Sequence, residues 1–423
     1  MKASAETSPP SISLAEYAQR RDTVLDALEG SAAIVLAGVE GPSGPTRWKT
    51  DRSFWYLTGL DYESGAAVLF DPTTEDPRRR ITLFLRARDQ EAERWNGPRE
   101  PLGSTLKSMT GFAGIRRTGD LPAALTAAAR RAKRLACLHP FAPYTADCSP
   151  DLELFRRIRE RVPGVAVEDR TQILPAMRAV KSPAELALIE RAVAATAAGF
   201  NAALSLIRPG VREGHIADSL TTAFREHGSE PAYPPIVGSG VNGTVLHYVD
   251  NDAVVEAGDL IVIDCAAAYR GYASDVSRTL PAGGTFTAEQ REVYEVVLAA
   301  QLAAVAVARP GATMTEVDDA ARTVIDKAGY EDFFMHGIGH PLGIEVHDVA
   351  PDGPLKPGMV LTVEPGVYLP ERGFGVRIED DILITESGHR DLTAGIPKTV
   401  PAIEEAMARG AASGPTGSRA PRA

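Results

Sequence analysis

The sequence predicts an α/β protein with two domains, the second of which contains two similar halves. A chain of 423 residues is longer than most single domains. Short apolar runs of strand length are mixed with longer helical patterns along it, which is typical of α/β architecture. One turn-and-helix pattern also occurs twice in the second part of the chain, 101 residues apart.

The first domain is expected to cover residues 1–175 and to have an α/β fold. Residues 1–12 are polar and contain prolines, which indicates a loose arm. The patterns that follow predict helices over residues 13–29, 121–138 and 151–162, and strands over residues 32–38, 66–70 and 81–85. Because strands and helices follow each other in mixed order, both are expected to share one layered core.

The second domain is expected to cover residues 176–407 and to begin with a capped helix. Ser182, Pro183 and Glu185 have the spacing of a capping box with proline at the first helical position. An amphipathic run follows directly. The last segment, residues 408–423, is rich in Gly, Ala, Ser and Pro and is expected to be disordered.

An internal repeat divides the second domain. Residues 208–218 align with residues 309–319, and each copy predicts a Pro-Gly turn followed by a helix that ends in glycine. Chemically active residues follow nearly the same spacing in the pairs His247 and His347, Asp264 and Glu364, and Asp275 and Glu379. Each half therefore supplies one histidine and two carboxylates, which predicts a pseudo-twofold arrangement around a shared centre.

Five residues are the candidate metal ligands: Asp264, Asp275, His340, Glu364 and Glu379. Each lies in or beside an apolar run that predicts a strand, or in a Gly-rich segment. Burying four acids close together is very costly unless cations neutralise them. Oxygen-rich ligation with one imidazole suits Mn²⁺, Mg²⁺, Co²⁺ or Zn²⁺ in a two-metal site. The sequence therefore predicts a hydrolase with a dinuclear metal centre.

The first two carboxylates are expected on a β-hairpin. An apolar strand leads into Asp264, and residues 269–271 have the composition of a turn. A hairpin closed there places Asp264 and Asp275 opposite each other on one face. Glu364 ends another apolar strand, just before a Pro-Gly pair that breaks it.

The remaining candidates lie in two short segments. Residues 375–384 alternate in polarity, so Arg377 and Glu379 are expected on one face of a single strand, where Arg377 can orient a carboxylate. His336, His340 and His347 crowd one Gly-rich segment, in which glycines allow the backbone to approach a site closely.

These motifs resemble the metallopeptidase family with the pita-bread fold, which includes methionine aminopeptidase, prolidase and aminopeptidase P. The matching pieces, in family order, are IDCAAAYRGYASDVSRT, MHGIGHPLGIEVHD, TVEPGVY and GVRIEDDILIT. In the first domain, SFWYLTG and RWNGPR resemble the N-terminal domain of aminopeptidase P and prolidase. The resemblance covers nearly the whole chain and favours the aminopeptidase P branch.

The resemblance also implies roles for single residues. Asp264, Asp275, His340, Glu364 and Glu379 would hold two divalent cations, with Mn²⁺ favoured over Co²⁺, Zn²⁺ and Fe²⁺. His247 and His347 would contact the substrate carbonyl and the tetrahedral intermediate. His336 and Tyr368 would bind substrate, and Arg377 would orient ligands and substrate.

The expected activity is hydrolysis of the peptide bond before a proline in the second position, with Glu364 carrying the proton. An Xaa-Pro dipeptidase is the nearest alternative. More distant alternatives are metal-free creatinase-like hydrolysis and a non-catalytic peptide-binding module. The resemblance also implies a homo-oligomer, either a dimer or a tetramer.

Composition excludes several other classes of protein. The net charge of −11 and the absence of a basic run argue against nucleic acid as a partner. No apolar stretch is long enough to span a bilayer, and the first residues have no apolar core of a signal peptide. Three cysteines, Cys137, Cys148 and Cys265, are too few for a disulfide framework. A cytoplasmic location is therefore expected.

Overall fold

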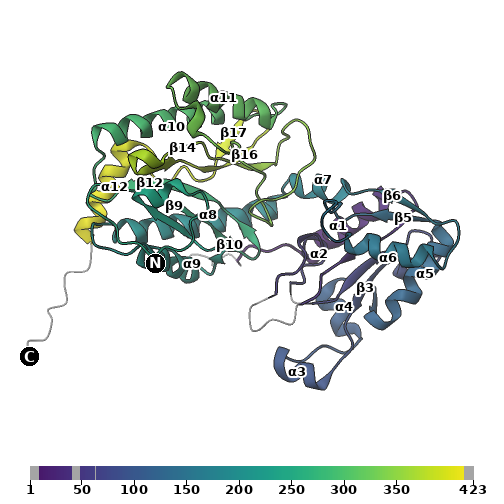
Figure 1. The fold of residues 1–423 in the computed structure, drawn as a ribbon. Helices are drawn as coiled ribbons and strands as arrows, with labels where there is room; N and C mark the ends of the chain where they lie inside the picture. The colour runs from purple at the N-terminus through teal and green to yellow at the C-terminus, as the bar shows by residue number, and fades with distance from the viewer. Residues whose placement is uncertain (1–8, 41–47, 62, 414–423) are drawn as a thin grey trace, which may run out of the picture. The chain divides into compact units, whose positions relative to one another are not determined.

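The structure is a computed structural model that describes residues 9–40, 48–61 and 63–413. It contains two compact units, one formed by residues 12–178 and the other beginning at Ala179 (Figure 1). Each unit has its own hydrophobic core and is described separately below.

The N-terminal unit is built on a six-stranded sheet with the order β4-β3-β2-β1-β5-β6. Its strands are β1 (Ala32–Leu36), β2 (Ala67–Phe70), β3 (Ile81–Leu85), β4 (Gly114–Arg117), β5 (Arg134–Cys137) and β6 (Ala166–Asp169). β1 pairs with β2, and β2 with β3, in antiparallel fashion, whereas the other pairs are parallel. The sheet is therefore mixed.

The helices of this unit are α1 (Leu14–Ala27), α2 (Arg52–Thr58), α3 (Gln90–Asn96), α4 (Ser104–Thr110), α5 (Leu121–Ala132), α6 (Pro150–Arg159) and α7 (Ile173–Ala179). Apolar residues of α5 and α6, such as Leu125 and Phe155, are buried against strands β1 and β5 in one core cluster. The predicted α/β architecture of this part of the chain is thus confirmed.

One helix prediction in this unit is wrong at its end. The helix predicted over residues 121–138 stops at Ala132, and Lys133 has a left-handed backbone with a φ of 56°. Arg134–Cys137 then forms β5, because this apolar segment pairs with β1 on one side and β6 on the other. Alanine and leucine fit a helix locally, so the long-range pairing overrides a local preference.

The C-terminal unit contains two pairs of long helices with strands between them (Figure 1). The helices are α8 (Pro183–Leu204), α9 (Glu213–Glu226), α10 (Ala288–Val307), α11 (Met314–Lys327) and α12 (Val400–Ser413). In Figure 1, α10 and α11 lie on one side of the strands and α8 and α9 on the other. The predicted capping box at the start of α8 is present, with Ser182 accepting from Glu185 and Glu185 accepting from Ser182.

The strands of this unit form small antiparallel sheets with the orders β12-β9-β8, β11-β10-β7, β13-β16-β17 and β14-β15. The first half supplies β7 (Glu230–Pro231), β8 (Ile236–Ser239), β9 (Leu260–Cys265), β10 (Ala267–Tyr269), β11 (Tyr272–Ala273) and β12 (Val276–Pro281). The second half supplies β13 (Val360–Val363), β14 (Gly366–Leu369), β15 (Phe374–Arg377), β16 (Asp380–Ile384) and β17 (His389–Asp391).

The predicted repeat is visible in the backbone. Gly210 and Gly311 both have a φ of 87°, a conformation that favours glycine. The amide of Gly210 donates to the Val255 carbonyl over 2.8 Å, and the amide of Gly311 donates to the Leu355 carbonyl over 2.9 Å. The two halves thus fold the same way from similar sequence signals.

The end of the chain differs from the prediction of a disordered segment after residue 407. Helix α12 continues to Ser413, since alanine-rich sequence favours a helix. Residues 414–423 lie outside the described part of the chain.

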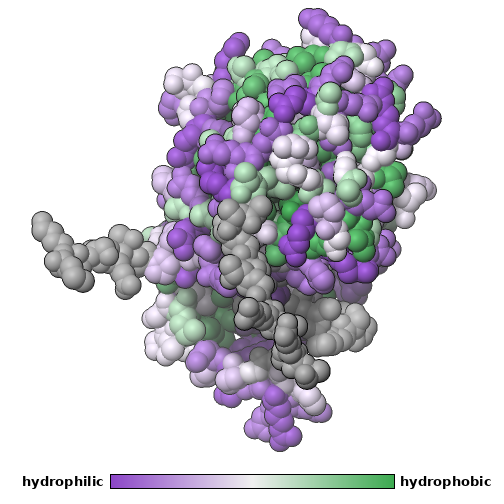
Figure 2. Space-filling view, turned by 90° about the vertical axis from the view of Figure 1, so that its left-hand side faces the viewer, coloured by the Kyte–Doolittle hydropathy of each residue, from purple (hydrophilic) through white to green (hydrophobic). Residues whose placement is uncertain are grey.

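On the face that Figure 2 shows, hydrophilic residues are mixed with small hydrophobic areas. Within the described residues, no helix combines the length and the apolar character needed to cross a membrane.

Candidate metal centre

The first two candidate ligands come from the predicted β-hairpin, but with a different register. The hairpin closes at Arg270 and Gly271, whose φ values of 48° and 91° fit a two-residue turn. Asp264 in β9 pairs with Ser277 in β12, and not with Asp275 as expected. Asp275 lies two residues before Ser277 and so shares its face, diagonal to Asp264.

Tyr233 joins these two carboxylates. This residue, just before β8, directs its hydroxyl at a carboxylate oxygen of Asp264 and at Oδ1 of Asp275, 2.5 Å away in the second case. A hydroxyl has one hydrogen and donates to one carboxylate at a time. The second close contact therefore needs a proton on one of the acids or a cation beside them.

His340 and Glu364 are positioned by one short backbone ladder. The Thr362 amide donates to the His340 carbonyl over 2.9 Å, and the Glu364 amide donates to the Ile338 carbonyl over 2.8 Å. Gly339 lies between them with a φ of 158°, and a Cβ there would come within 2.1 Å of the Thr362 carbonyl oxygen. Glycine is therefore required for the histidine segment to approach β13.

The segment that carries Arg377 and Glu379 is not the single strand that was expected. β15 ends at Arg377 and β16 begins at Asp380, and the two strands belong to different sheets. Glu379 lies in the gap, where its amide donates to the Ser277 carbonyl over 3.1 Å. Because the chain changes sheets here, the expected alternation along one strand does not hold. Arg377 and Glu379 still meet at Ser277, whose hydroxyl lies 2.8 Å from the Arg377 Nε and 2.8 Å from Glu379 Oε2.

The five predicted ligands converge on one point. Ligand atoms of Asp275, His340 and Glu379 all lie within 4.8 Å of one another. The His340 Nε2 is 3.6 Å from Asp275 Oδ2 and 3.6 Å from Glu364 Oε1. The other ring nitrogen, Nδ1, lies 3.1 Å from the Pro341 carbonyl, so Nε2 is the atom that faces the acids. Asp264 joins the cluster through Tyr233.

The acids repel one another strongly. Burial and then the charge of Asp264 raise the pKa of Asp275, and burial and then the charge of Asp275 raise the pKa of Glu379. Burial raises the pKa of Glu364 to about 7 although the charge of Arg377 lowers it. Burial and the neighbouring carboxylates both favour the protonated acids, so positive charge placed among them would favour their ionised forms.

Arg377 supplies part of that charge. Its Nη2 donates to Asp264 Oδ2 over 2.7 Å, and its Nη1 donates to the Tyr368 hydroxyl over 3.0 Å. One guanidinium cannot balance four carboxylates. Together with one neutral imidazole, the donor set fits divalent cations, which prefer carboxylate oxygen and imidazole nitrogen.

The other predicted histidines are placed differently from one another. His336 lies 2.9 Å from the Tyr368 hydroxyl, and burial lowers its pKa to about 4. His347 stacks on His340 with ring centroids 3.9 Å apart. His247 is exposed, and among the described residues no hydrogen bond to its ring is found. The structure thus places His347 against the candidate ligand His340 and His336 against Tyr368, whereas no contact of His247 with the cluster is found among the described residues.

Sequence reasoning missed two polar residues of the cluster, Tyr233 and Ser277. Tyr233 precedes a Pro-Pro pair and a short strand, a position with no spacing signal for a site. Ser277 lies two residues after Asp275 in the predicted hairpin, and residues two apart in a strand share a face, so its position beside Asp275 was readable from the sequence.

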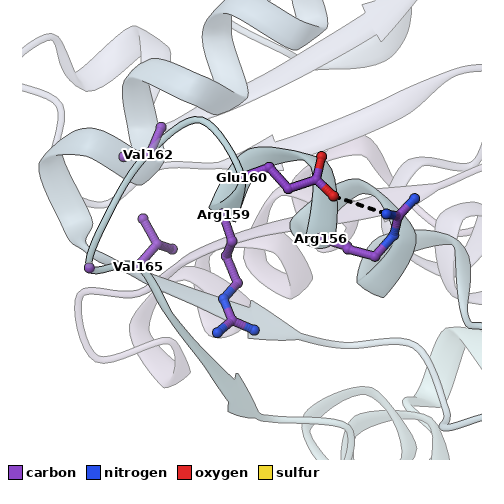
Figure 3. Close-up of a pocket in the computed structure, with 6 residues that line it drawn as sticks. Arg156, Arg159, Glu160, Val162 and Val165 are labelled. Atoms are coloured by element: carbon purple, nitrogen blue, oxygen red, sulfur yellow. Dashed lines mark hydrogen bonds and ion pairs between the residues drawn. The ribbon is translucent and has the colours of Figure 1, made fainter.

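A separate hollow lies in the N-terminal unit, beside the end of α6 and the start of β6 (Figure 3). It has a volume of about 430 Å³ and is lined by Arg156, Arg159, Glu160, Val162, Gly164 and Val165. Glu160 is paired with Arg156 over 2.9 Å, and both side chains are largely exposed. The hollow holds no cluster of candidate ligands comparable to the acids of the C-terminal unit.

Comparison with known proteins identifies two regions of the chain. The aminopeptidase P N-terminal domain matches residues 17–136, and metallopeptidase family M24 matches residues 187–386. The Xaa-Pro aminopeptidase of Escherichia coli is 35% identical, over 94% of this chain and 98% of its own length. An Xaa-Pro dipeptidase of Pyrococcus furiosus is 41% identical, but over 52% of this chain and 65% of its own length.

A solved structure extends this similarity to the fold. The aminopeptidase PepP of Pseudomonas aeruginosa superimposes with a TM-score of 0.85 at 33% sequence identity, covering 95% of this chain and 99% of that one. The predicted N-terminal α/β domain and C-terminal pita-bread domain are thereby confirmed. With matching regions in family order and an acid cluster suited to divalent cations, the chain belongs to metallopeptidase family M24, in its aminopeptidase P branch.

Proposed function

We propose that this protein is a metal-dependent aminopeptidase that hydrolyses the bond between the first residue of a peptide and a proline in the second position. The convergence of Asp275, His340 and Glu379, joined by Asp264 and Glu364, carries the proposal. The similarity to Xaa-Pro aminopeptidases along nearly the whole chain supports the substrate class.

An Xaa-Pro dipeptidase is the second candidate. The similarity to a dipeptidase over the catalytic half, at 41% identity, is its support. The aminopeptidase is favoured because its relatives also match the N-terminal unit. A non-catalytic peptide-binding module is disfavoured because all five candidate ligands are present and gathered in one place.

The metal site would use all five predicted ligands. The carboxylates of Asp264, Asp275, Glu364 and Glu379 and the imidazole of His340 would together hold the divalent cations. We favour two Mn²⁺ ions, although the donor set also suits Co²⁺, Zn²⁺ and Fe²⁺. Bound divalent cations supply positive charge for the scissile carbonyl and lower the pKa of a nearby water.

Glu364 is the proposed proton carrier. It is the candidate ligand with the most exposed side chain, 19%, so its carboxylate is the one that a water molecule and the substrate can reach most easily. It would take a proton from the attacking water and deliver it to the leaving prolyl nitrogen. The other carboxylates lie deeper and are held by fixed donors.

Further side chains would bind the substrate. His247 and His347 would donate to the carbonyl oxygen and to the oxyanion that develops on it, a role worth about 3–4 kcal/mol per donor. Arg377 would hold Asp264 and Tyr368 in place, as its contacts of 2.7 and 3.0 Å support. His336 and Tyr368 would contact the peptide together, since they are hydrogen-bonded to each other.

The proposal also covers the domain boundaries, the oligomeric state and the location of the protein. Residues 176–407, extended by the end of α12 to Ser413, would form the catalytic domain, and residues 1–175 would form the N-terminal domain. The enzyme would form a dimer or tetramer, as its family resemblance implies. Three cysteines without a disulfide among them support a cytoplasmic location.

The deciding experiment compares two substrates on metal-stripped protein reloaded with Mn²⁺. An Xaa-Pro-Xaa tripeptide should be cleaved in preference to an Xaa-Pro dipeptide. Preference for the dipeptide would instead establish the second candidate. Cleavage of neither peptide, with both metal equivalents bound, would rule out the proposed substrate class.

A further inference from the structure

Glu213 is a buried acid outside the metal cluster that the mechanism does not use. It is the first residue of α9 and is fully buried, yet among the described residues no ion pair with a cation is found for it. A buried carboxylate is stable only when hydrogen bonds satisfy its oxygens. The donors that satisfy Glu213 all come from one segment, residues 239–253.

The hydrogen bonds to Glu213 come from both ends and from the middle of residues 239–253. Oε1 accepts from the Ser239 amide over 2.6 Å, from its hydroxyl over 2.7 Å and from the Asn242 side chain over 3.3 Å. Oε2 accepts from the Tyr248 hydroxyl over 2.9 Å and from the Ala253 amide over 3.0 Å. One side chain therefore ties both ends and the middle of the segment to the start of α9.

This segment carries His247, next to Tyr248. Ser239 is the last residue of β8, and apart from the short 3-10 helix Gly240–Thr244 the rest of the segment has no helix or strand. Its apolar side chains do not anchor it, because Val245 and Val249 are 54% and 51% exposed. Asn251 fixes the far end through Val237 and Pro235. Beside His247, the Tyr248 hydroxyl contacts Glu213 Oε2 over 2.9 Å, Asp252 Oδ1 over 3.1 Å and the Asn242 side chain over 3.0 Å, and of these three partners Glu213 is the one outside the loop.

The second half of the repeat has no glutamate at the position that corresponds to Glu213. The residue 101 positions after Glu213 is Met314, which begins α11. In that half, His347 stacks directly on His340. Among the described residues His247 has no such ring contact, so its position depends on the support of its loop.

From this geometry we infer that Glu213 is a positioning residue, which holds the loop of residues 239–253 so that His247 faces the substrate. The inference rests on the proposed role of His247 in substrate binding. Loss of the carboxylate would leave the metal ligands in place and let His247 move. A displacement of about 1 Å at a substrate-binding group can lower the rate by about 100-fold.

The first test uses Glu213→Gln, His247→Ala and the double variant with an Xaa-Pro-Xaa tripeptide. We expect Glu213→Gln to lower kcat/KM by roughly 10- to 100-fold with unchanged metal content. The double variant should have the same kcat/KM as His247→Ala, because both substitutions remove the same contribution, that of a correctly placed His247. If Glu213→Gln lowers kcat/KM by the same factor in the His247→Ala variant as in the wild-type protein, the inference is overturned.

A second measurement does not depend on the substrate. Hydrogen exchange of the backbone amides should become faster within residues 239–253 of Glu213→Gln, and should be unchanged in β9 and β12. Unchanged exchange in the loop would overturn the inference even if no Xaa-Pro peptide is cleaved. If the wild-type protein cleaves no Xaa-Pro peptide but exchange within residues 239–253 is still faster in Glu213→Gln, the proposed function is refuted and the role of Glu213 in holding the loop is not.

Glu316→Gln is the matched control. Glu316 lies in the first turn of α11, in the corresponding helix of the second half, and its carboxylate bonds only to the adjacent Thr313 among the described residues. Its substitution should leave kcat/KM and the exchange of residues 239–253 unchanged.

Discussion

Two neighbouring acids, Glu379 and Asp380, lie in opposite electrostatic surroundings. Both are buried, with 2% and 0% of their surface exposed. Asp380 accepts from Arg278 over 2.6 Å and from Lys398 over 2.5 Å. Burial raises its pKa, but the charges of Arg278 and Lys398 outweigh burial and the pKa falls below its usual value.

Glu379 faces the other way and has no such partners. It lies among acids, and burial with the charge of Asp275 raises its pKa well above the usual value. Glu379 lies in the gap before β16 and Asp380 begins that strand, so one peptide unit separates an acid paired with two cations from an acid that lies among other acids. The comparison teaches that a buried acid without a protein cation marks where a metal is needed, whereas a paired acid marks the structural core.

The largest expected effect is on catalysis. Glu364→Ala should lower kcat by about 10²- to 10⁴-fold, because the proposed proton carrier is lost. The measurement is the turnover of an Xaa-Pro-Xaa tripeptide, with metal content determined in parallel. Glu386→Ala, at an exposed position, is the control and should keep full activity. Turnover near the wild-type value in Glu364→Ala, with metal bound, would contradict the proposed role.

The next effect is on the stability of the folded protein, and it tests the pairing of Asp380 with Arg278 and Lys398. Asp380→Asn should lower the free energy of unfolding by about 3–5 kcal/mol, because Arg278 loses a buried partner. Urea unfolding of the metal-free protein measures it. Glu379→Gln is the matched control and should not destabilise the metal-free protein, since it removes repulsion. Equal losses in both variants would show that the two acids do not differ as described.

Metal binding should stabilise the folded protein. Mn²⁺ at about 100 times its dissociation constant should add about 2.7 kcal/mol, provided it binds only the folded state. A shift in thermal unfolding after reloading of stripped protein measures this. The shift should largely disappear in Glu379→Gln and persist in Asp380→Asn. Persistence in both variants would locate the metal elsewhere.

The smallest effect is a pH dependence of the metal-free protein. Glu364 has a folded-state pKa of about 7 against an ordinary value of 4.5, so the folded state keeps a proton that the unfolded state releases. Its contribution to stability is therefore present below about pH 4.5 and lost as the pH rises towards 7. Asp380, with a lowered pKa, acts in the opposite direction and loses its contribution only in acid. Glu364→Gln should flatten the fall between these pH values in thermal unfolding.

Much of the fold could be predicted because local signals were strong. The capping box at Ser182 and the Pro-Gly turns at Gly210 and Gly311 are found where the sequence places them. The strand β5 was missed because Arg134–Cys137 has no local preference strong enough to reveal its pairing with β1. The hairpin was foreseen, but its register was wrong by two residues, since the composition of a turn does not fix which residues pair.

The sequence by itself determined that buried acids are in excess, that they recur at a spacing of about 100 residues, and that they need cations. These conclusions follow from residue type and periodicity alone. Only the tertiary structure decided which acids are left without a counter-ion, as Glu379 is and Asp380 is not. It also decided that Tyr233 joins Asp264 to Asp275 and that Glu213 holds the His247 loop. The reason is that these contacts join residues distant in sequence, and hydrogen bonds and charge pairs depend on distances of a few ångströms that no local pattern encodes.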